Sequence, residues 1–304
     1  MTYLNTKYLM SVCVIALTWL TNIAHSKDDN TFLGLTPPQD VPIVLAPEII
    51  SLTEQVELNA VFHPNGKEFY FCRRVNDVYR LFVIKKHAND NWSLPERVHL
   101  KEMDDYEIVD PWISPDGQRM IYISNAPTST FAKGSVNLWV MQREGDTWGA
   151  PKLLPAPINS NAREIYPVYT NSGNLYFSST REGGLGGYDI YVAKYVDGQY
   201  QPPENLGKPV NSAGREGDVF VAPDESYLIV AVGGRDDTFG KGDLYISHRS
   251  ANGKWGNLKN LGQVINTKEF DFTPTMSPNG KYFFFTTDGD IRWVSSNVIF
   301  STEK

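Results

Sequence analysis

The chain has 304 residues, of which 41% are apolar and 12% aromatic, and its formal charge is −7. That length suffices for one large repeat domain or two ordinary domains, each with a substantial core. The chain carries no run of basic residues, and a protein that binds nucleic acid needs clustered Lys and Arg to replace backbone counterions. Composition therefore argues against nucleic acid, and equally against an anionic membrane surface, as partners.

Residues 1–26 have the pattern of a secretory signal peptide. Lys7 supplies the positive start, residues 8–20 form an apolar run too short to cross a bilayer, and Ala24 and Ser26 are the small residues that a signal peptidase reads. The alternatives are a buried helix or a membrane anchor. We expect cleavage and export to the periplasm or the cell exterior, with no membrane span in the mature chain. Only Cys72 remains after cleavage, so no internal disulfide is expected.

A short apolar strand followed by a turn of the Pro-Asp-Gly type occurs five times. Each turn precedes an aromatic and β-branched strand, a third strand, and a fourth strand that follows an aromatic residue. Four short strands per repeat are typical of a propeller blade, so the sequence predicts an all-β, five-bladed β-propeller with four-stranded antiparallel blades. The expected blades are residues 57–102, 103–158, 159–210, 211–265 and 266–297. The aligned turn residues lie 51 to 56 positions apart and are Pro64, Pro115, Asn171, Pro223 and Pro278.

The fifth repeat ends after its third strand, at Trp293 and Val294. Residues 46–50 resemble residues 150–154, which are expected to form a fourth strand. We therefore expect an N-terminal strand at residues 46–50 to complete the last blade and close the ring, so that no strand edge is left unpaired there. Residues 27–45 should form an extended, Pro-rich arm, and residues 46–304 a single propeller domain.

Three motifs resemble the Pro-Asp (WD-like) propeller repeat of TolB-like periplasmic proteins. They are Ser-Pro-Asp-Gly at residues 114–117, Asp-Ile-Tyr at 189–191 and Asp-Leu-Tyr at 243–245. The stretches 32–38 and 46–51 are similar to the lead-in of an exported bacterial subgroup of these proteins. The resemblance spans residues 32–297 and implies the fold, but it leaves the activity open. TolB also carries an α/β domain and takes part in a cell-envelope complex; this chain has no room for that domain, so the Tol partnership is not carried over.

Acidic residues gather at the start of the innermost strands. Because side chains alternate along a strand, residues two apart are expected on one side, around one mouth of the central channel, with Arg163 and Arg215 beside them. Five residues before the aligned turn positions stand Asn59, Asp110, Tyr166, Asp218 and Thr273. Two residues earlier stand Glu57, Ile108, Glu164, Glu216 and Asp271.

These carboxylates have three interpretations. They could act as general acid, general base or electrostatic stabiliser on a sugar, as in some five-bladed glycosidases. They could instead hold a hard cation such as Ca²⁺. They could also only form hydrogen bonds and salt bridges at strand ends. The candidates for catalysis are Asp110, Glu164, Glu216, Asp218 and Asp271.

Glycine-rich loops are expected after the second strands of the middle repeats, at residues 125–134, 180–188 and 233–242. No Lys-Ser or Lys-Thr follows them and no helix is expected there, which excludes a phosphate-binding P-loop. Arg181 and Arg235 hold equivalent places, where they could bind a ligand carboxylate or pair with acidic neighbours.

The sequence therefore predicts an exported, monomeric TolB-like propeller that binds a glycan, a peptide or an envelope protein at its channel mouth without catalysis. The alternative is a carbohydrate-active enzyme of the glycoside hydrolase or lyase type that uses the same carboxylates. No cofactor is expected unless the carboxylates hold Ca²⁺. The expected ligand-binding residues are Glu57, Asp110, Arg163, Glu164, Tyr166, Arg181, Arg215, Asp218, Arg235 and Asp271.

Overall fold

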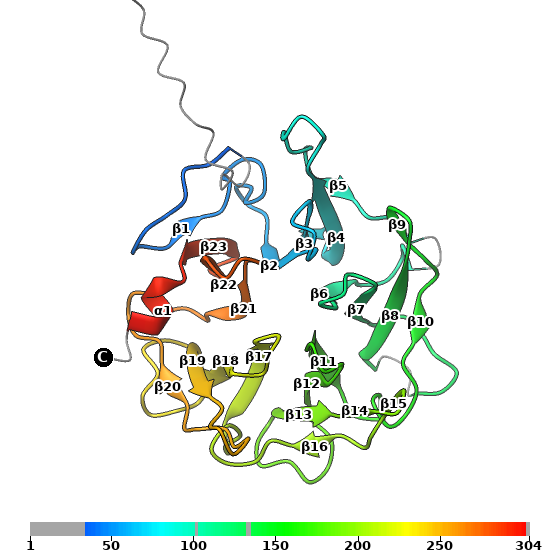
Figure 1. The fold of residues 1–304 in the computed structure, drawn as a ribbon, viewed down its shortest axis with the longest axis vertical. Coiled ribbons are helices and arrows are strands. Elements are labelled where there is room, and N and C mark those ends of the chain that lie inside the picture. The colour runs from blue at the N-terminus through cyan, green and yellow to red at the C-terminus, as the bar shows by residue number, and fades with distance from the viewer. Residues whose placement is uncertain (1–33, 101–102, 132–134, 302–304) are drawn as a thin grey trace, which may run out of the picture.

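A computed structural model describes residues 34–100, 103–131 and 135–301. The predicted signal peptide and the first part of the predicted arm lie outside these ranges. Within them, no helix is both long and apolar enough to cross a membrane. Five antiparallel sheets are arranged radially around a common axis, which confirms the predicted five-bladed propeller (Figure 1).

The first strand of each blade lies nearest the axis, and the later strands follow it outward (Figure 1). Blade one consists of β2 (Glu57–Phe62), β3 (Glu68–Val75), β4 (Val78–Lys85) and β5 (Glu96–Arg97). Blade two consists of β6 (Val109–Ile113), β7 (Arg119–Ser124), β8 (Asn137–Glu144) and β10 (Lys152–Leu153), with β9 (Thr147–Trp148) also paired to β8. Blade three consists of β11 (Glu164–Tyr169), β12 (Leu175–Ser179), β13 (Asp189–Ala193) and β16 (Glu204–Asn205), with the small hairpin β14 (Tyr195–Val196) and β15 (Gln199–Tyr200). Blade four consists of β17 (Arg215–Val221), β18 (Tyr227–Gly233), β19 (Asp243–His248) and β20 (Lys259–Asn260). Blade five consists of β21 (Phe272–Met276), β22 (Tyr282–Thr287), β23 (Asp290–Ser295) and β1 (Ile43–Val44).

The second strands are apolar on both faces because each blade packs between two others. In β22, Phe283 and Phe285 pack into the cluster shared with blade four, whereas Phe284 between them packs against Phe69 and Phe71 of blade one. This alternation is the two-residue period of a strand, with an apolar neighbour on either side. A short helix, α1 (Asn297–Ser301), follows β23 and buries Val298 and Ile299 in the same cluster as blade four.

An N-terminal strand closes the ring, as predicted, but it lies at Ile43–Val44 and not at residues 46–50. Ile43 pairs with Trp293 and Val44 with Arg292, and the Leu45 backbone N–H donates to the Ile291 carbonyl at 2.8 Å. Residues 46–50 form the turn that follows, in which the Ile50 N–H donates to the Ala46 carbonyl at 2.9 Å.

The prediction of a strand at residues 46–50 was wrong because these residues correspond to the turn that follows the outermost strand in other blades. In blade four, β20 is followed by Leu261 and Gly262, and the Asn266 N–H donates to the Gly262 carbonyl at 2.8 Å. Ala46 takes the place of this glycine and shares its positive φ, at 43° against 82°. An alanine in the left-handed region hides the correspondence at the level of sequence.

A buried polar contact joins blades one and two. Arg143 of β8 donates to the Glu68 carboxylate of β3 at 2.5 Å, and the two side chains are 8% and 9% exposed. Tyr70 also donates to Glu68, and it accepts from the Trp148 indole at 3.0 Å. Burial alone would raise the pKa of Glu68, but the hydrogen bonds from Arg143 and Tyr70 lower it below its ordinary value, so the carboxylate is held ionised.

A similar contact joins blades three and four, but here the carboxylate comes from the later of the two blades, whereas Glu68 belongs to the earlier one. Tyr176 of blade three donates to Glu225 of blade four at 2.8 Å, and Arg249 donates to Glu225 at 2.5 Å. Arg249 also lies over the Trp255 ring, as Arg143 lies over Trp148.

We expect the Arg143→Met variant to lose about 3–5 kcal/mol of unfolding free energy, because it leaves Glu68 buried without its cation. Arg74→Met is the matched control, since Arg74 pairs with Asp77 in solvent, and it should change stability by less than about 1 kcal/mol. Equilibrium unfolding in urea measures both variants. Equal stability of the two variants would show that the Glu68 contact is not a stabilising link between blades.

Candidate functional site

Every innermost strand contains a β-bulge at nearly the same place. The register of pairing with the second strand shifts between Leu58 and Val61 in β2, and at the corresponding positions in β6, β11 and β21. In β17 the shift comes one residue earlier in the repeat, between Glu216 and Val219. The bulge residue has positive φ in four of the five strands: Asn59, Asp110, Tyr166 and Thr273, at 63°, 51°, 54° and 49°. Such backbone is costly for a bulky or β-branched residue, so the surrounding blades must hold it in place.

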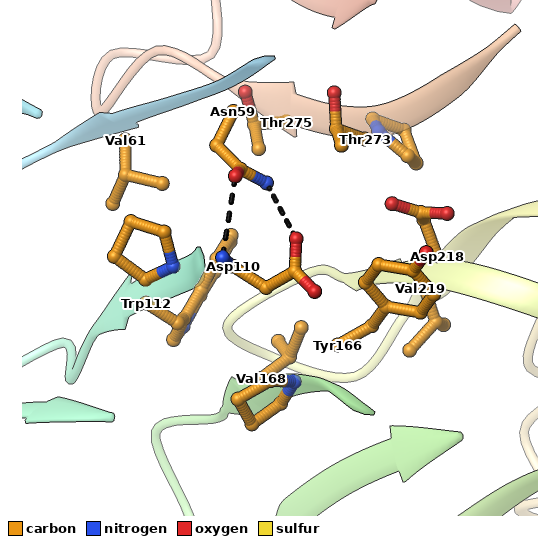
Figure 2. A pocket seen from close by; sticks show the side chains of 13 residues that line it. Asn59, Val61, Asp110, Trp112, Tyr166, Val168, Asp218, Val219, Thr273 and Thr275 are labelled. Carbon is orange, nitrogen blue, oxygen red and sulfur yellow. Dashed lines mark hydrogen bonds between the residues drawn. The ribbon is translucent and has the colours of Figure 1, made fainter. Parts of the chain in front are cut away.

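The bulges turn five side chains toward one space on the axis, which we call the polar chamber (Figure 2). Its volume is about 30 Å³, enough for roughly two water molecules. The five residues come one from each blade, and they are Asn59, Asp110, Tyr166, Asp218 and Thr273.

Asp110 is held by Asn59 of the neighbouring blade. The Asn59 amide N–H donates to Asp110 Oδ1 at 3.2 Å, and the Asp110 backbone N–H donates back to Asn59 Oδ1 at 3.3 Å (Figure 2). Asp110 is 5% exposed, and its other oxygen, Oδ2, has no hydrogen-bond partner among the described residues. Burial raises the pKa of Asp110 well above its ordinary value, and the nearby charge of Asp218 raises it further.

Asp218 lies in the chamber under similar conditions. It is 3% exposed, and no described group bonds its Oδ1. Burial raises the pKa of Asp218 to about 7, although the backbone N–H groups of Asp218 and Thr273, the Tyr166 hydroxyl and the charge of Arg215 act in the opposite direction. Two carboxyl groups thus share a small, buried space with little positive charge to compensate them.

The other predicted acids lie elsewhere. Each is fully buried, and each of its two oxygens already accepts a hydrogen bond from the loop that leads into its strand or from an arginine. In blade four, for example, the Ser212 N–H and hydroxyl donate to the two oxygens of Glu216 at 3.2 and 2.5 Å. The residues of this group are Glu57, Glu164, Glu216 and Asp271. The structure therefore separates two sets that simple alternation placed together, because the bulge between them breaks the alternation.

Two of the predicted arginines, Arg181 and Arg235, already pair with acceptors of the protein itself. Arg181 donates to Glu164 at 3.1 Å and to the Ile158 carbonyl at 2.7 Å, and Arg235 donates to Asp237 at 2.9 Å. Arg73, which the sequence did not single out, makes the same contacts as Arg181 in blade one.

Arg163 and Arg215 are exposed beside the start of their strands. Arg215 lies over the Tyr188 ring at 5.0 Å and is the cation that acts on Asp218. Of the predicted arginines, Arg215 is therefore the one shown to act electrostatically on the polar chamber.

The aspartates that begin the third strands organise the glycine-rich loops. Asp189 Oδ1 accepts from the Gly186 N–H, and Asp243 Oδ1 accepts from the Gly240 N–H, both at 3.2 Å. Asn205 and Asn260 of the outer strands also donate to these carboxylates, at 2.9 and 2.8 Å. These recurring residues serve the loop structure of each blade.

A second cavity lies on the axis toward the Pro-Asp-Gly turns, and we call it the turn-side cavity. Its volume is about 310 Å³, and all five aligned turn residues line it. Apolar and aromatic side chains from the last part of the innermost strands cover its wall, and no charged side chain is among the described residues that line it. They include Val61, Phe62, Trp112, Ile113, Tyr169, Phe220 and Met276.

Trp112 lies between the two cavities and lines both. Its indole N–H donates to the Tyr169 carbonyl at 3.3 Å, and its ring meets the Phe220 ring of blade four edge-on at 5.8 Å. The sequence interpretation missed the turn-side cavity because it considered ionisable groups alone. The available signal was the run of apolar residues directly before each turn.

No family model and no curated protein matches this sequence. Among solved structures, a putative TolB from Agrobacterium tumefaciens is 17% identical over 78% of this chain and 71% of that chain, with a TM-score of 0.51. A structure described as a glycoside hydrolase is 13% identical over 86% of this chain and 92% of that chain, with a TM-score of 0.56.

These likenesses define the class of protein by its fold. The chain is a five-bladed β-propeller whose fold is similar to that of a TolB structure and to that of a structure described as a glycoside hydrolase. At such low identity the fold is all that the likeness shows, so the activity must be argued from the cavities.

The contribution of Asp218 to the stability of the protein should fall as the pH rises from about 4 to about 7. Because the pKa of Asp218 is about 7 in the folded protein and 3.8 ordinarily, the native state binds more protons than the unfolded chain in this window. We expect Asp218→Asn to remove much of this decline and to raise the Tm above wild type by several degrees at about pH 8.

Thermal unfolding in EDTA across this pH range measures the effect, with the exposed Asp236→Asn as control. The same pH slope in wild type and Asp218→Asn would contradict the assignment.

Proposed function

We propose that this chain is an exported, monomeric propeller that binds a peptide or a segment of an envelope protein without catalysis, with the turn-side cavity as its binding site. The observation that carries the proposal is the cavity of about 310 Å³ with an apolar, uncharged wall on the axis of the ring. Ligand sites are typically concave, mostly apolar and largely preformed. An uncharged wall favours an apolar side chain, such as a leucine or an aromatic ring, over a charged group or a glycan rich in hydroxyls.

The carboxylates do not favour the alternative of a carbohydrate-active enzyme. A glycosidase needs two carboxyl groups on either side of a sugar ring, and three of the five candidate catalytic acids, Glu164, Glu216 and Asp271, already bond to their own loops. The remaining pair, Asp110 and Asp218, faces a chamber of about 30 Å³, which is far too small for a sugar. The enzymatic interpretation would require the channel to open by a large rearrangement of Trp112 and Tyr166.

Export rests on the predicted signal peptide at residues 1–26 and on the resemblance to TolB-like periplasmic proteins. Cys72, the one cysteine that remains after the predicted cleavage, is fully buried and suits an oxidising compartment because it is out of reach of oxidants. The periplasm and the cell exterior are both consistent with these features.

The turn-side cavity can be tested by filling it. Peptides selected by display on the wild-type protein should share an apolar or aromatic anchor residue. Met276→Trp, which places a large ring in the cavity, should weaken their binding at least about tenfold, because one buried apolar side chain contributes about 1.5–3 kcal/mol. Isothermal titration calorimetry measures the affinity, and unchanged thermal unfolding shows that the variant is folded.

Leu94→Ala, at an exposed apolar residue outside the cavity, is the matched control and should leave binding unchanged. If Asp110→Asn lost peptide binding while Met276→Trp bound as tightly as wild type, the binding site would have to be assigned to the polar chamber instead. Hydrolysis of any glycoside in a screening panel, abolished by Asp110→Asn, would overturn the non-catalytic proposal.

A further inference from the structure

Two buried oxygen atoms in the polar chamber lack a partner. They are Asp110 Oδ2 and Asp218 Oδ1, and among the buried carboxylates that the structure describes, no other oxygen is left without a hydrogen bond. Every comparable carboxylate, such as Glu216 or Glu225, accepts bonds at both oxygens. An unpaired buried carboxylate oxygen is strongly disfavoured, so this pair is expected to be satisfied by a proton, a water molecule or a cation.

We propose that the polar chamber binds one hard cation, Ca²⁺, between Asp110 of blade two and Asp218 of blade four. This inference does not depend on the turn-side cavity or on its ligand. It assigns the two unpaired oxygens to the first coordination shell of the ion.

The local charge favours a cation at this place. When both are ionised, Asp110 and Asp218 bring two negative charges, Glu107 adds a third farther out, and the Tyr166 hydroxyl is neutral. Arg215, the positive charge that acts on Asp218, is exposed to solvent, where water weakens its effect. The mutual repulsion of the two carboxyl groups disappears when a cation lies between them.

The donor atoms favour Ca²⁺ over other metals. The side-chain oxygens of the chamber come from Asn59, Asp110, Asp218, Tyr166 and Thr273, and no thiol or imidazole lines it in the described part of the chain. This composition argues against Zn²⁺ and Cu²⁺. The Thr273 hydroxyl is also bonded to that of Thr286 at 2.6 Å. Mg²⁺ demands a near-ideal octahedron and gives up its waters reluctantly, whereas Ca²⁺ accepts an irregular shell of protein and water oxygens.

Asn59 is a positioning residue and not a ligand. Its amide N–H points to Asp110 Oδ1 and its carbonyl oxygen accepts the Asp110 backbone N–H, so both ends are occupied. This double contact fixes the Asp110 carboxyl and leaves Oδ2 directed into the chamber (Figure 2).

The expected affinity is modest. No third His, Cys, Asp or Glu joins the pair within the described ranges, so the site has two carboxylates and otherwise neutral ligands. Sites of low ligand charge bind Ca²⁺ with Kd values of roughly 10⁻⁴–10⁻³ M, the range of extracellular modules. A site of this strength would be filled outside the cell and empty in the cytosol.

Thermal unfolding of the mature protein, stripped with EDTA and dialysed, tests the proposal. CaCl₂ at about 10 mM should raise the Tm of wild type by about 3–6 °C, and MgCl₂ by much less. Asp110→Asn and Asp218→Asn should each raise the Tm without metal and abolish the response to Ca²⁺. The exposed Asp236→Asn should respond like wild type.

Calorimetric titration with CaCl₂ should show one saturable site in wild type and none in either chamber variant. Absence of saturable binding up to about 10 mM, or undiminished binding in both variants, would overturn the cation site. An equal response to Mg²⁺ would overturn the assignment to Ca²⁺. A Tm that depends on pH through Asp110 and Asp218 but on no cation would show that protons neutralise the pair instead. Peptide binding at the turn-side cavity is measured separately, so its failure cannot be mistaken for failure of this site.

Discussion

The pairing of β1 with β23 is the constraint on which the ring depends. It involves two residue pairs and one further backbone hydrogen bond, yet it joins the start of the propeller to its last blade. Apolar packing strengthens it, since Leu45 and Ile50 are buried in a cluster with Trp293 of blade five and Phe71 of blade one. Both cavities are lined by residues of all five blades, so neither would keep its shape if this closure opened.

The repeated bulge explains why a propeller with many acids at its channel presents only two of them to the axis. A regular strand would direct Glu57 and Asn59, or Glu216 and Asp218, to one side. The extra residue in each innermost strand turns the later side chain into the chamber and leaves the earlier one against the incoming loop. Backbone geometry thus divides the acids into loop-holding and axis-facing sets, although their residue types are the same.

The sequence was sufficient for the fold, because repeated turns and aromatic strands signal each blade independently and five copies reinforce one another. It was less sufficient where one residue departs from the repeat. Because Ala46 stands where the repeat has glycine, the closing strand was predicted three positions too late in the chain. The helix α1 was not predicted because it is too short for a periodic pattern. Asp110, Tyr166 and Asp218 were identified from their positions in the repeat. The hydrogen bonds that Glu164, Glu216 and Arg181 make within the protein could not be predicted from the sequence. A bulge has no reliable sequence signal in these strands, and the partners depend on how the loops fold.

The two cavities on the axis are unlike, but Val61, Trp112 and Thr275 line both of them. The Trp112 ring contributes to the apolar wall on the turn side, while its neighbours Pro111 and Asp110 line the polar chamber. Asp110, Trp112 and Phe220 therefore lie in one continuous set of contacts across the channel, from blade two to blade four. A change of charge or occupancy between Asp110 and Asp218 acts on the same two innermost strands, β6 and β17, that carry Trp112 and Phe220. The carboxyl pair and part of the apolar wall of the turn-side cavity are therefore carried by the same two strands, which is why the polar and the apolar space lie directly next to each other on the axis.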